Sequence, residues 1–194
     1  TGSLTIVGNV SPAGGNFEEP VTQATLKVVG AFHGLSRDRA NSRRYPAIDP
    51  LESWSKYESF IPQTQRDKGA KILKKSNSVY QMMKVVGEEG TSIEDFIEYL
   101  KGEFFDAVFL QQNAFDKIDE ATSAERQKYV ISVIEEILDQ PMKFDSKESA
   151  RTFFLELRQK FITWNSSAFQ SDAFKRLEGE LRDKLKPKAG KNDA

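Results

Sequence analysis

Apolar residues recur every three or four positions along the chain after about residue 63, which is the spacing of one face of an α-helix. This pattern predicts five helices, over about residues 65–86, 92–109, 122–138, 145–164 and 174–185. Each helix has one apolar stripe that needs a neighbour to cover it. The second part of the chain is therefore predicted to be a helical bundle.

Short polar signals predict where these helices begin and end. Three pairs are expected at N-termini: Ser92 with Asp95, Thr122 with Glu125, and Asp145 with Glu148. Gly87 follows the first apolar stripe and is expected to end that helix, and Gly90 closes the loop after it. The bundle is thus predicted to consist of separate helices joined by short loops.

The first 62 residues show a different pattern. Leu4–Val10 is a β-branched run that predicts a buried strand, although no other stretch offers a convincing partner strand. Pro20–Gly34 predicts a helix with His33 on one face, and Ser36–Ser42 predicts a short polar helix. We expect Tyr45-Pro46 to be extended, because proline keeps the preceding residue out of the α region. The fold is predicted to be mainly α, with a helical bundle after a short remnant (strand, loop and helices) of an α/β domain.

The predicted segments are 1–62 for the edge of the α/β domain, 63–186 for the bundle and 187–194 for a polar, disordered tail. The chain opens with Thr1 instead of Met and runs at once into the strand-like stretch. A single strand cannot form a sheet, so we expect the chain to be a truncated part of a longer protein.

Composition narrows the functional classes. The chain has 28 basic and 29 acidic residues and a net charge of −1, so it has no overall field that would attract nucleic acid or an anionic membrane. It contains no cysteine and one histidine, which removes disulfides and thiol chemistry and disfavours zinc. We predict no metal site and no nucleic-acid partner.

Catalytic motifs are missing from the sequence. It has no glycine-rich phosphate loop ending in lysine, and Gly87–Gly90 places two glutamates where a phosphate would have to sit. His33 has no convincing serine or cysteine partner and is expected to pack on its helix. We therefore predict no catalytic residue in this chain.

One segment is specific enough to indicate a family. Thr5–Thr22 reads TIVGNVSPAGGNFEEPVT and resembles the catalytic subunit, the A or alpha chain, of V-type and archaeal-type rotary ATPases and ATP synthases. In that family, the strand and glycine-containing loop belong to the nucleotide-binding domain, and the resemblance implies that the loop faces the central stalk. The stalk-contact residues would then be Pro12, Gly14, Gly15 and Phe17.

Two further segments support the resemblance. Arg43–Ser53 reads RRYPAIDPLES, and Phe109–Asp116 reads FLQQNAFD; both are similar to segments that surround adenine in this family. The resemblance assigns Tyr45 as the stacking residue and Phe115 as the opposite wall, with Gln112 and Ala114 beside it. Arg37, Arg39, Arg43 and Arg44 form a basic run that we expect to be a subunit-facing surface; the family's arginine finger comes from the neighbouring subunit.

The resemblance implies a part of an ion-translocating ATPase or ATP synthase. The full-length subunit would bind ATP or ADP with Mg²⁺, alternate with the non-catalytic B subunit in a hexamer, and turn central-stalk subunits that drive ion transport in a membrane sector. It would be cytoplasmic and peripheral to the membrane. The present chain would supply the adenine side and a helical lever, would be inactive alone, and would hold no bound cofactor. The alternative is a helical protein-interaction module without nucleotide chemistry.

Overall fold

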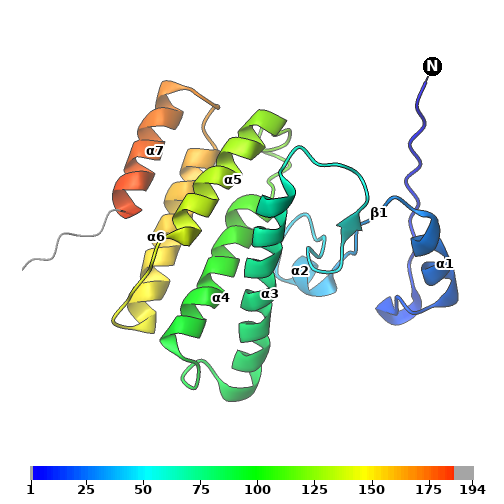
Figure 1. The fold of residues 1–194 in the computed structure, drawn as a ribbon, viewed down its shortest axis with the longest axis horizontal. Coiled ribbons are helices and arrows are strands. Elements are labelled where there is room, and N and C mark those ends of the chain that lie inside the picture. The colour runs from blue at the N-terminus through cyan, green and yellow to red at the C-terminus, as the bar shows by residue number, and fades with distance from the viewer. Residues whose placement is uncertain (1, 186–194) are drawn as a thin grey trace, which may run out of the picture.

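The computed structural model describes residues 2–185, which form mainly helices (Figure 1). In chain order the elements are η1 (Ala13–Gly15), α1 (Pro20–Val28), β1 (Ala31–Phe32), α2 (Arg37–Asn41), β2 (Trp54–Ser55), α3 (Gln63–Val86), α4 (Ile93–Phe105), η2 (Asp106–Leu110), α5 (Ala124–Asp139), α6 (Lys147–Asn165) and α7 (Asp172–Leu185). The predicted fold class is confirmed. The predicted disordered tail, 187–194, lies outside the described residues.

The predicted strand Leu4–Val10 is wrong. This segment has no regular structure, and Leu4, Ile6 and Val7 are exposed. A strand is stable only when its backbone groups pair with a neighbour, and no neighbouring strand lies beside this segment among residues 2–185. The apolar run therefore extends away from the rest of the chain (Figure 1).

The helix predicted over Pro20–Gly34 is too long. Helix α1 ends at Val28, and Ala31–Phe32 instead pairs antiparallel with Trp54–Ser55. The ring of Phe32 packs edge-on against Phe17, with ring centroids 5.5 Å apart. Because this segment is a strand, His33 is exposed outside any helix and does not pack on a helix face as expected.

The five predicted helices of the bundle are confirmed. Helix α3 packs against α4, α4 against α6, and α6 against α7 (Figure 1). Helix α5 adds Ile134 and Ile137 to the same apolar core, whose other fully buried large side chains are Phe104, Leu157, Phe161, Trp164 and Leu181. Helices α3 and α4 approach closely at Gly102, where an added Cβ would lie 2.1 Å from Ser76 Cβ.

Two of the three predicted helix starts are shifted by one residue. Ser92 caps α4 as predicted, by accepting a hydrogen bond from Asp95 N. Ser123 caps α5 in place of Thr122, and Ser146 forms a reciprocal box with Ser149 in place of Asp145. In both cases the serine hydroxyl reaches the backbone nitrogen three residues later. Gly87, at φ 76°, ends α3 as predicted.

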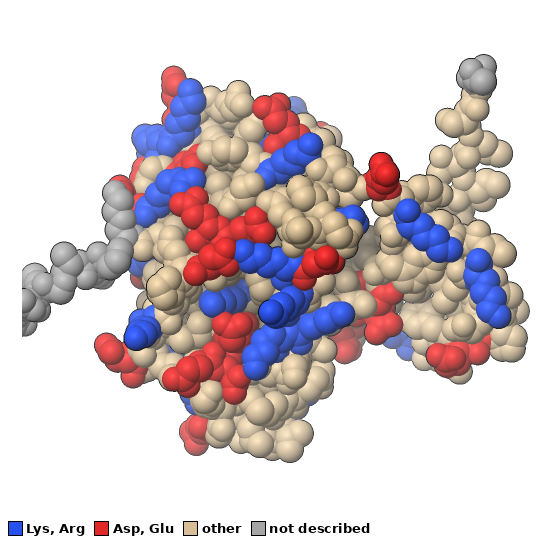
Figure 2. Space-filling model, in the orientation of Figure 1, with Lys and Arg blue, Asp and Glu red and all other residues tan. Residues whose placement is uncertain are grey.

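The bundle surface carries mixed charge. Figure 2 shows lysine and arginine interspersed with aspartate and glutamate across one face of the bundle. Many charged side chains of the bundle form ion pairs, such as Arg182 with Glu178 at 2.9 Å. No described helix is long and apolar enough to span a bilayer. This face has no one-signed area that would attract a polyanion.

Candidate nucleotide-binding hollow

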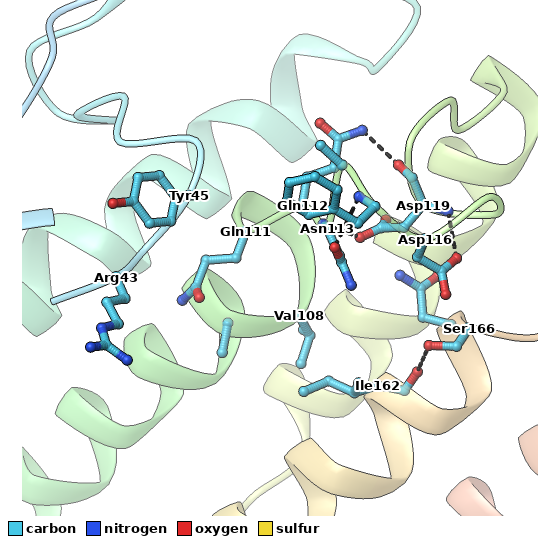
Figure 3. A pocket seen from close by; sticks show the side chains of 14 residues that line it. Arg43, Tyr45, Val108, Gln111, Gln112, Asn113, Asp116, Asp119, Ile162 and Ser166 are labelled. Atoms are coloured by element: carbon cyan, nitrogen blue, oxygen red, sulfur yellow. Dashed lines mark hydrogen bonds between the residues drawn. The ribbon is translucent and has the colours of Figure 1, made fainter. Parts of the chain in front are cut away.

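A hollow of about 640 Å³ lies where the segment around Tyr45 meets the loop that follows η2. It is lined by Tyr45, by the loop residues 111–116 and Asp119, and by the C-terminal end of α6 (Figure 3). The four residues predicted for an adenine pocket, Tyr45, Gln112, Ala114 and Phe115, all line this hollow. Tyr45 is 67 to 70 positions away in the sequence from the other three residues, yet the fold brings all four to one hollow.

A backbone hydrogen bond joins the two sides of the hollow. Gln112 N donates to the carbonyl oxygen of Tyr45 at 2.8 Å. Tyr45 is 55 % exposed as a residue, and its hydroxyl donates to Ala40 O at 3.5 Å. The ring is therefore attached at its backbone and leaves a face open to solvent, which is the state that a stacking residue needs before its ligand arrives.

The loop on the other side is held by its own polar groups. Gln112 Nε2 donates to Asp119 O at 2.7 Å, and Asn113 N donates to Asp119 Oδ2 at 2.6 Å. Asn113 Oδ1 then accepts from Phe115 N at 3.0 Å, and the Phe115 side chain is 98 % exposed. The side-chain nitrogen Nε2 of Gln112 is thus already bonded within the loop. The Phe115 side chain is almost fully exposed and is available to a ligand.

Charged residues lie directly behind Tyr45. Arg39 Nη1 donates to Asp106 Oδ1 at 2.7 Å, and Arg44 donates through both terminal nitrogens to Glu103, at 3.0 and 2.8 Å. Burial alone would lower the pKa of Arg44, but the hydrogen bond and charge of Glu103, with the charge of Asp106, raise the pKa above its ordinary value. These two arginines face the bundle and do not form the subunit-facing surface that the basic run predicted; Arg37 and Arg43 are exposed.

The predicted stalk-contact loop lies beside α1 (Figure 1), and none of its residues lines the hollow. Pro12 precedes the turn η1, which contains Gly14 at φ 65° and Gly15 at φ 77°. Both glycines adopt the left-handed conformation that other residues rarely accept. Phe17 is half-buried because it packs on Phe32. The glycines are exposed, so the tip of the loop is the accessible part.

Comparison with known proteins identifies the family. Residues 1–55 match the ATP synthase alpha/beta family, nucleotide-binding domain, and residues 59–149 match the C-terminal domain of V and A type ATP synthase. V-type ATP synthase alpha chains from Treponema denticola and Borrelia turicatae are 59 % and 54 % identical over 99 % and 96 % of this chain. The chain belongs to the V-type ATP synthase alpha-chain family. It spans about a third of the length of these relatives, 33 % and 32 %.

The alpha chain 1 of Treponema pallidum is 53 % identical to all of this chain, so the similarity extends through α6 and α7 to the last residues. A solved structure, a unique ATP synthase subunit NeqB from Nanoarcheaum equitans, covers 66 % of this chain and 32 % of its own, with a TM-score of 0.53 and 24 % identity. That likeness concerns the fold. The family predicted from Thr5–Thr22 and Arg43–Ser53 is confirmed, whereas the roles of single residues stay predictions.

Helix α6 contributes residues to this alpha-chain hollow that the sequence did not indicate. Ile162, Asn165 and Ser166 line the hollow, and Figure 3 shows Ile162 and Ser166 below the loop. Arg126, at the start of α5, is buried and donates to the backbone carbonyl and to Oδ1 of Asn165, the latter at 3.3 Å. Burial lowers the pKa of Arg126, against the charges of Asp119 and Asp116. The periodicity of α6 predicted its buried face but gave no sign that its last turn reaches the hollow.

Residues 2–185 contain no set of side chains that could ligate a metal ion. No three histidine, aspartate or glutamate side chains gather there closely enough to hold an ion. The hollow offers aromatic rings and amides, which suit a base, and its two carboxylates, Asp116 and Asp119, are too few to form a described metal cluster. The described residues thus fit the base of a nucleotide better than its metal-bound phosphates.

Proposed function

We propose that this chain is the adenine side of the catalytic alpha chain of a V-type rotary ATPase or ATP synthase, in which nucleotide turnover is coupled to ion transport across a membrane. The hydrogen bond between Gln112 N and Tyr45 O carries the proposal, since it holds the Tyr45 ring and the Phe115 loop around one hollow. The sequence similarity to alpha chains over nearly the whole chain supports it.

Adenine is a flat aromatic ligand that fits between these two side chains. One face of the adenine would stack on the Tyr45 ring, and the exposed Phe115 ring would cover the other face. Stacking of a base on an aromatic side chain is worth about 1–3 kcal/mol in single-stranded nucleic acids. That amount orients the base but is too small to bind a nucleotide tightly without contacts to its phosphates.

The phosphates and Mg²⁺ would be held by a part of the alpha chain that this sequence does not include. In the proposed assembly the alpha chain alternates with non-catalytic B subunits, and the B subunit supplies the arginine that stabilises transferred charge. The enzyme would lie in the cytoplasm, peripheral to the membrane sector that carries the ions. This chain alone would not hydrolyse ATP.

The remaining parts would transmit motion. We assign residues 1–62 to the edge of the nucleotide-binding domain and residues 63–186 to a bundle that acts as a lever. The lever would respond to nucleotide because its helix α4 runs through η2 directly into the loop 111–116. The tip of the loop at Gly14 and Gly15, which is exposed, would contact the central stalk.

The test uses the complex assembled from the full-length alpha chain. Tyr45→Ala should raise the KM for ATP about tenfold, which corresponds to the loss of one base-stacking contact. Tyr57→Ala is the matched control, because Tyr57 is also an exposed tyrosine of the same segment but does not line the hollow. Equal changes in the two variants would remove the assignment of the hollow to adenine.

A further inference from the structure

Asp106 lies at the centre of the contacts behind the hollow. It is the first residue of η2, and its side chain is 4 % exposed. Oδ1 accepts a hydrogen bond from Arg39 Nη1 at 2.7 Å, and Oδ2 accepts from Arg44 Nη1 at 3.2 Å and from Gln111 Nε2 at 3.0 Å. Its carbonyl oxygen accepts from Gln111 N at 3.0 Å. One buried carboxylate therefore binds two arginines and one residue of the loop.

Asp106 is connected to both sides of the hollow, and the two sides are bonded to each other. Arg44 precedes Tyr45 in the chain, and Gln111 precedes Gln112, whose backbone nitrogen donates to Tyr45 O. Asp106 binds the first residue of each pair, so both sides of the hollow are attached to the same side chain. A shift of Asp106 would move Tyr45 and the loop relative to one another.

We infer that Asp106 is a positioning residue, which fixes the separation between the Tyr45 ring and the loop 111–115 before nucleotide binds. This inference rests on the proposed function of the hollow. A site that is arranged in advance loses less conformational freedom on binding, and buried hydrogen bonds to an ionised group are strong enough to hold such an arrangement. Asp106 lines no part of the hollow itself, so it acts through its neighbours.

Glu103 is the natural comparison. It accepts two hydrogen bonds from Arg44, but no hydrogen bond joins it to the loop, and its side chain is 34 % exposed. If holding Arg44 in place were sufficient to position Tyr45 against the loop, Glu103 could do this without Asp106. The position of Asp106, between Arg44 and Gln111, is what distinguishes the two carboxylates.

The test uses complexes assembled with full-length alpha chains that carry Asp106→Asn, Glu103→Gln, Tyr45→Ala, or Asp106→Asn with Tyr45→Ala. Asparagine keeps the size of the side chain but removes the charge and one acceptor. We expect Asp106→Asn to raise the KM for ATP about tenfold with kcat changed by less than about threefold, and Glu103→Gln to raise KM by less than about threefold. In the Tyr45→Ala background, Asp106→Asn should add less than about twofold.

The outcomes separate this inference from the proposed function. If Tyr45→Ala leaves KM unchanged, the proposed function fails. If Tyr45→Ala raises KM and Asp106→Asn does not, or if Asp106→Asn has its full effect without Tyr45, the positioning role is overturned. An Asp106→Asn complex that loses kcat and thermal stability with KM unchanged would indicate only a structural role and would also overturn it.

A second variant covers the case in which Asp106→Asn does not assemble. Arg44→Gln cuts the same connection from the other side and leaves the pair between Asp106 and Arg39 intact. We expect it to raise KM about fivefold or more, again with little change in kcat. An unchanged KM in this variant would overturn the inference. Asp139→Asn, on an exposed carboxylate of α5, is the assembly control.

Discussion

Arg39 Nη1 lies 2.7 Å from Asp106 Oδ1, and the two side chains, which are 67 positions apart in the sequence, are 12 % and 4 % exposed. This contact joins α2, in the segment before the bundle, to the end of α4. Because both charges are buried, neither can be left without the other at small cost. The pair therefore fixes the orientation of the N-terminal segment on the bundle.

Loss of the Asp106 carboxylate should destabilise the 194-residue chain. Asp106→Asn leaves Arg39 without its buried counter-charge, while Arg44 keeps Glu103, and removing one partner of a buried pair costs about 3–5 kcal/mol. Urea unfolding followed by circular dichroism measures the loss. Asp139→Asn, which breaks an exposed pair with Lys68, should change the unfolding free energy by less than about 1 kcal/mol. Equal losses in the two variants would contradict this account.

The close packing of α3 on α4 should make Gly102 intolerant of substitution. In Gly102→Ala the new methyl group would lie 2.1 Å from Ser76 Cβ, and overpacking costs about 1–3 kcal/mol. Gly179→Ala in α7 is the matched control, because nothing lies within 4 Å of its added Cβ and alanine is the better helix former by about 1 kcal/mol. The midpoint temperature of thermal unfolding should fall for Gly102→Ala and rise for Gly179→Ala. A rise for both would mean that the helices are packed less closely than described.

The isolated chain should bind Mg-ATP weakly. The sequence has no phosphate loop, and Arg43 is the only cationic side chain among the described residues that line the hollow. We expect a Kd above about 100 µM by calorimetry, with adenosine binding about as well as ATP, because one arginine beside two aspartates gives the phosphates little net attraction. Submicromolar binding of Mg-ATP would contradict the proposal that this chain holds only the base and that another part of the alpha chain holds the phosphates.

Tyr99 should ionise late in an alkaline titration. Burial and the charge of Glu103 raise the pKa of Tyr99 from 10.0 to about 12. A raised phenol pKa means that the folded state favours the neutral form, so this contribution to stability is complete below pH 10 and is lost as the pH rises through about 12. Absorbance near 295 nm follows the ionisation.

Tyr99→Phe provides the control for that titration. The variant should lack the transition with a midpoint of about 12 and should lose stability less steeply between pH 10 and 12. The pKa of Tyr129 is also raised, by burial and by its hydrogen bond to Glu178, so its ionisation should remain in the variant. A late transition of the same size in both proteins would assign it to another group.

The helices were predictable because their cause is local. Periodic apolar residues and serine caps determine a helix within a few turns, as at α4 with Ser92 and α3 with Gly87. The strands were not, since β1 and β2 have two residues each and exist only because Phe32 meets Trp54 from a distant segment. The strand predicted at Leu4–Val10 failed for the same reason, because its local preference met no partner.

The site was predictable only as far as the family resemblance reached. Tyr45 and Phe115 were named from two short segments, and the fold places both at one hollow. The buried pairs of Arg39 and Arg44 looked like a basic surface run, because a sequence does not show which acid 60 or more positions away will face an arginine. Asn165 was unforeseen, since its place follows from how α6 crosses the bundle.

The turn η2 has a consequence for insertions and deletions. Its hydrogen bond from Gln111 N to Asp106 O spans five residues, whereas an α-helix spans four, so this turn holds one residue more than the helix before it. Deleting Ala107 would let α4 continue in regular register and would rotate everything after it by about 100°. Gln111 would then face away from Asp106, so the number of residues in this single turn determines the orientation of the loop 111–116.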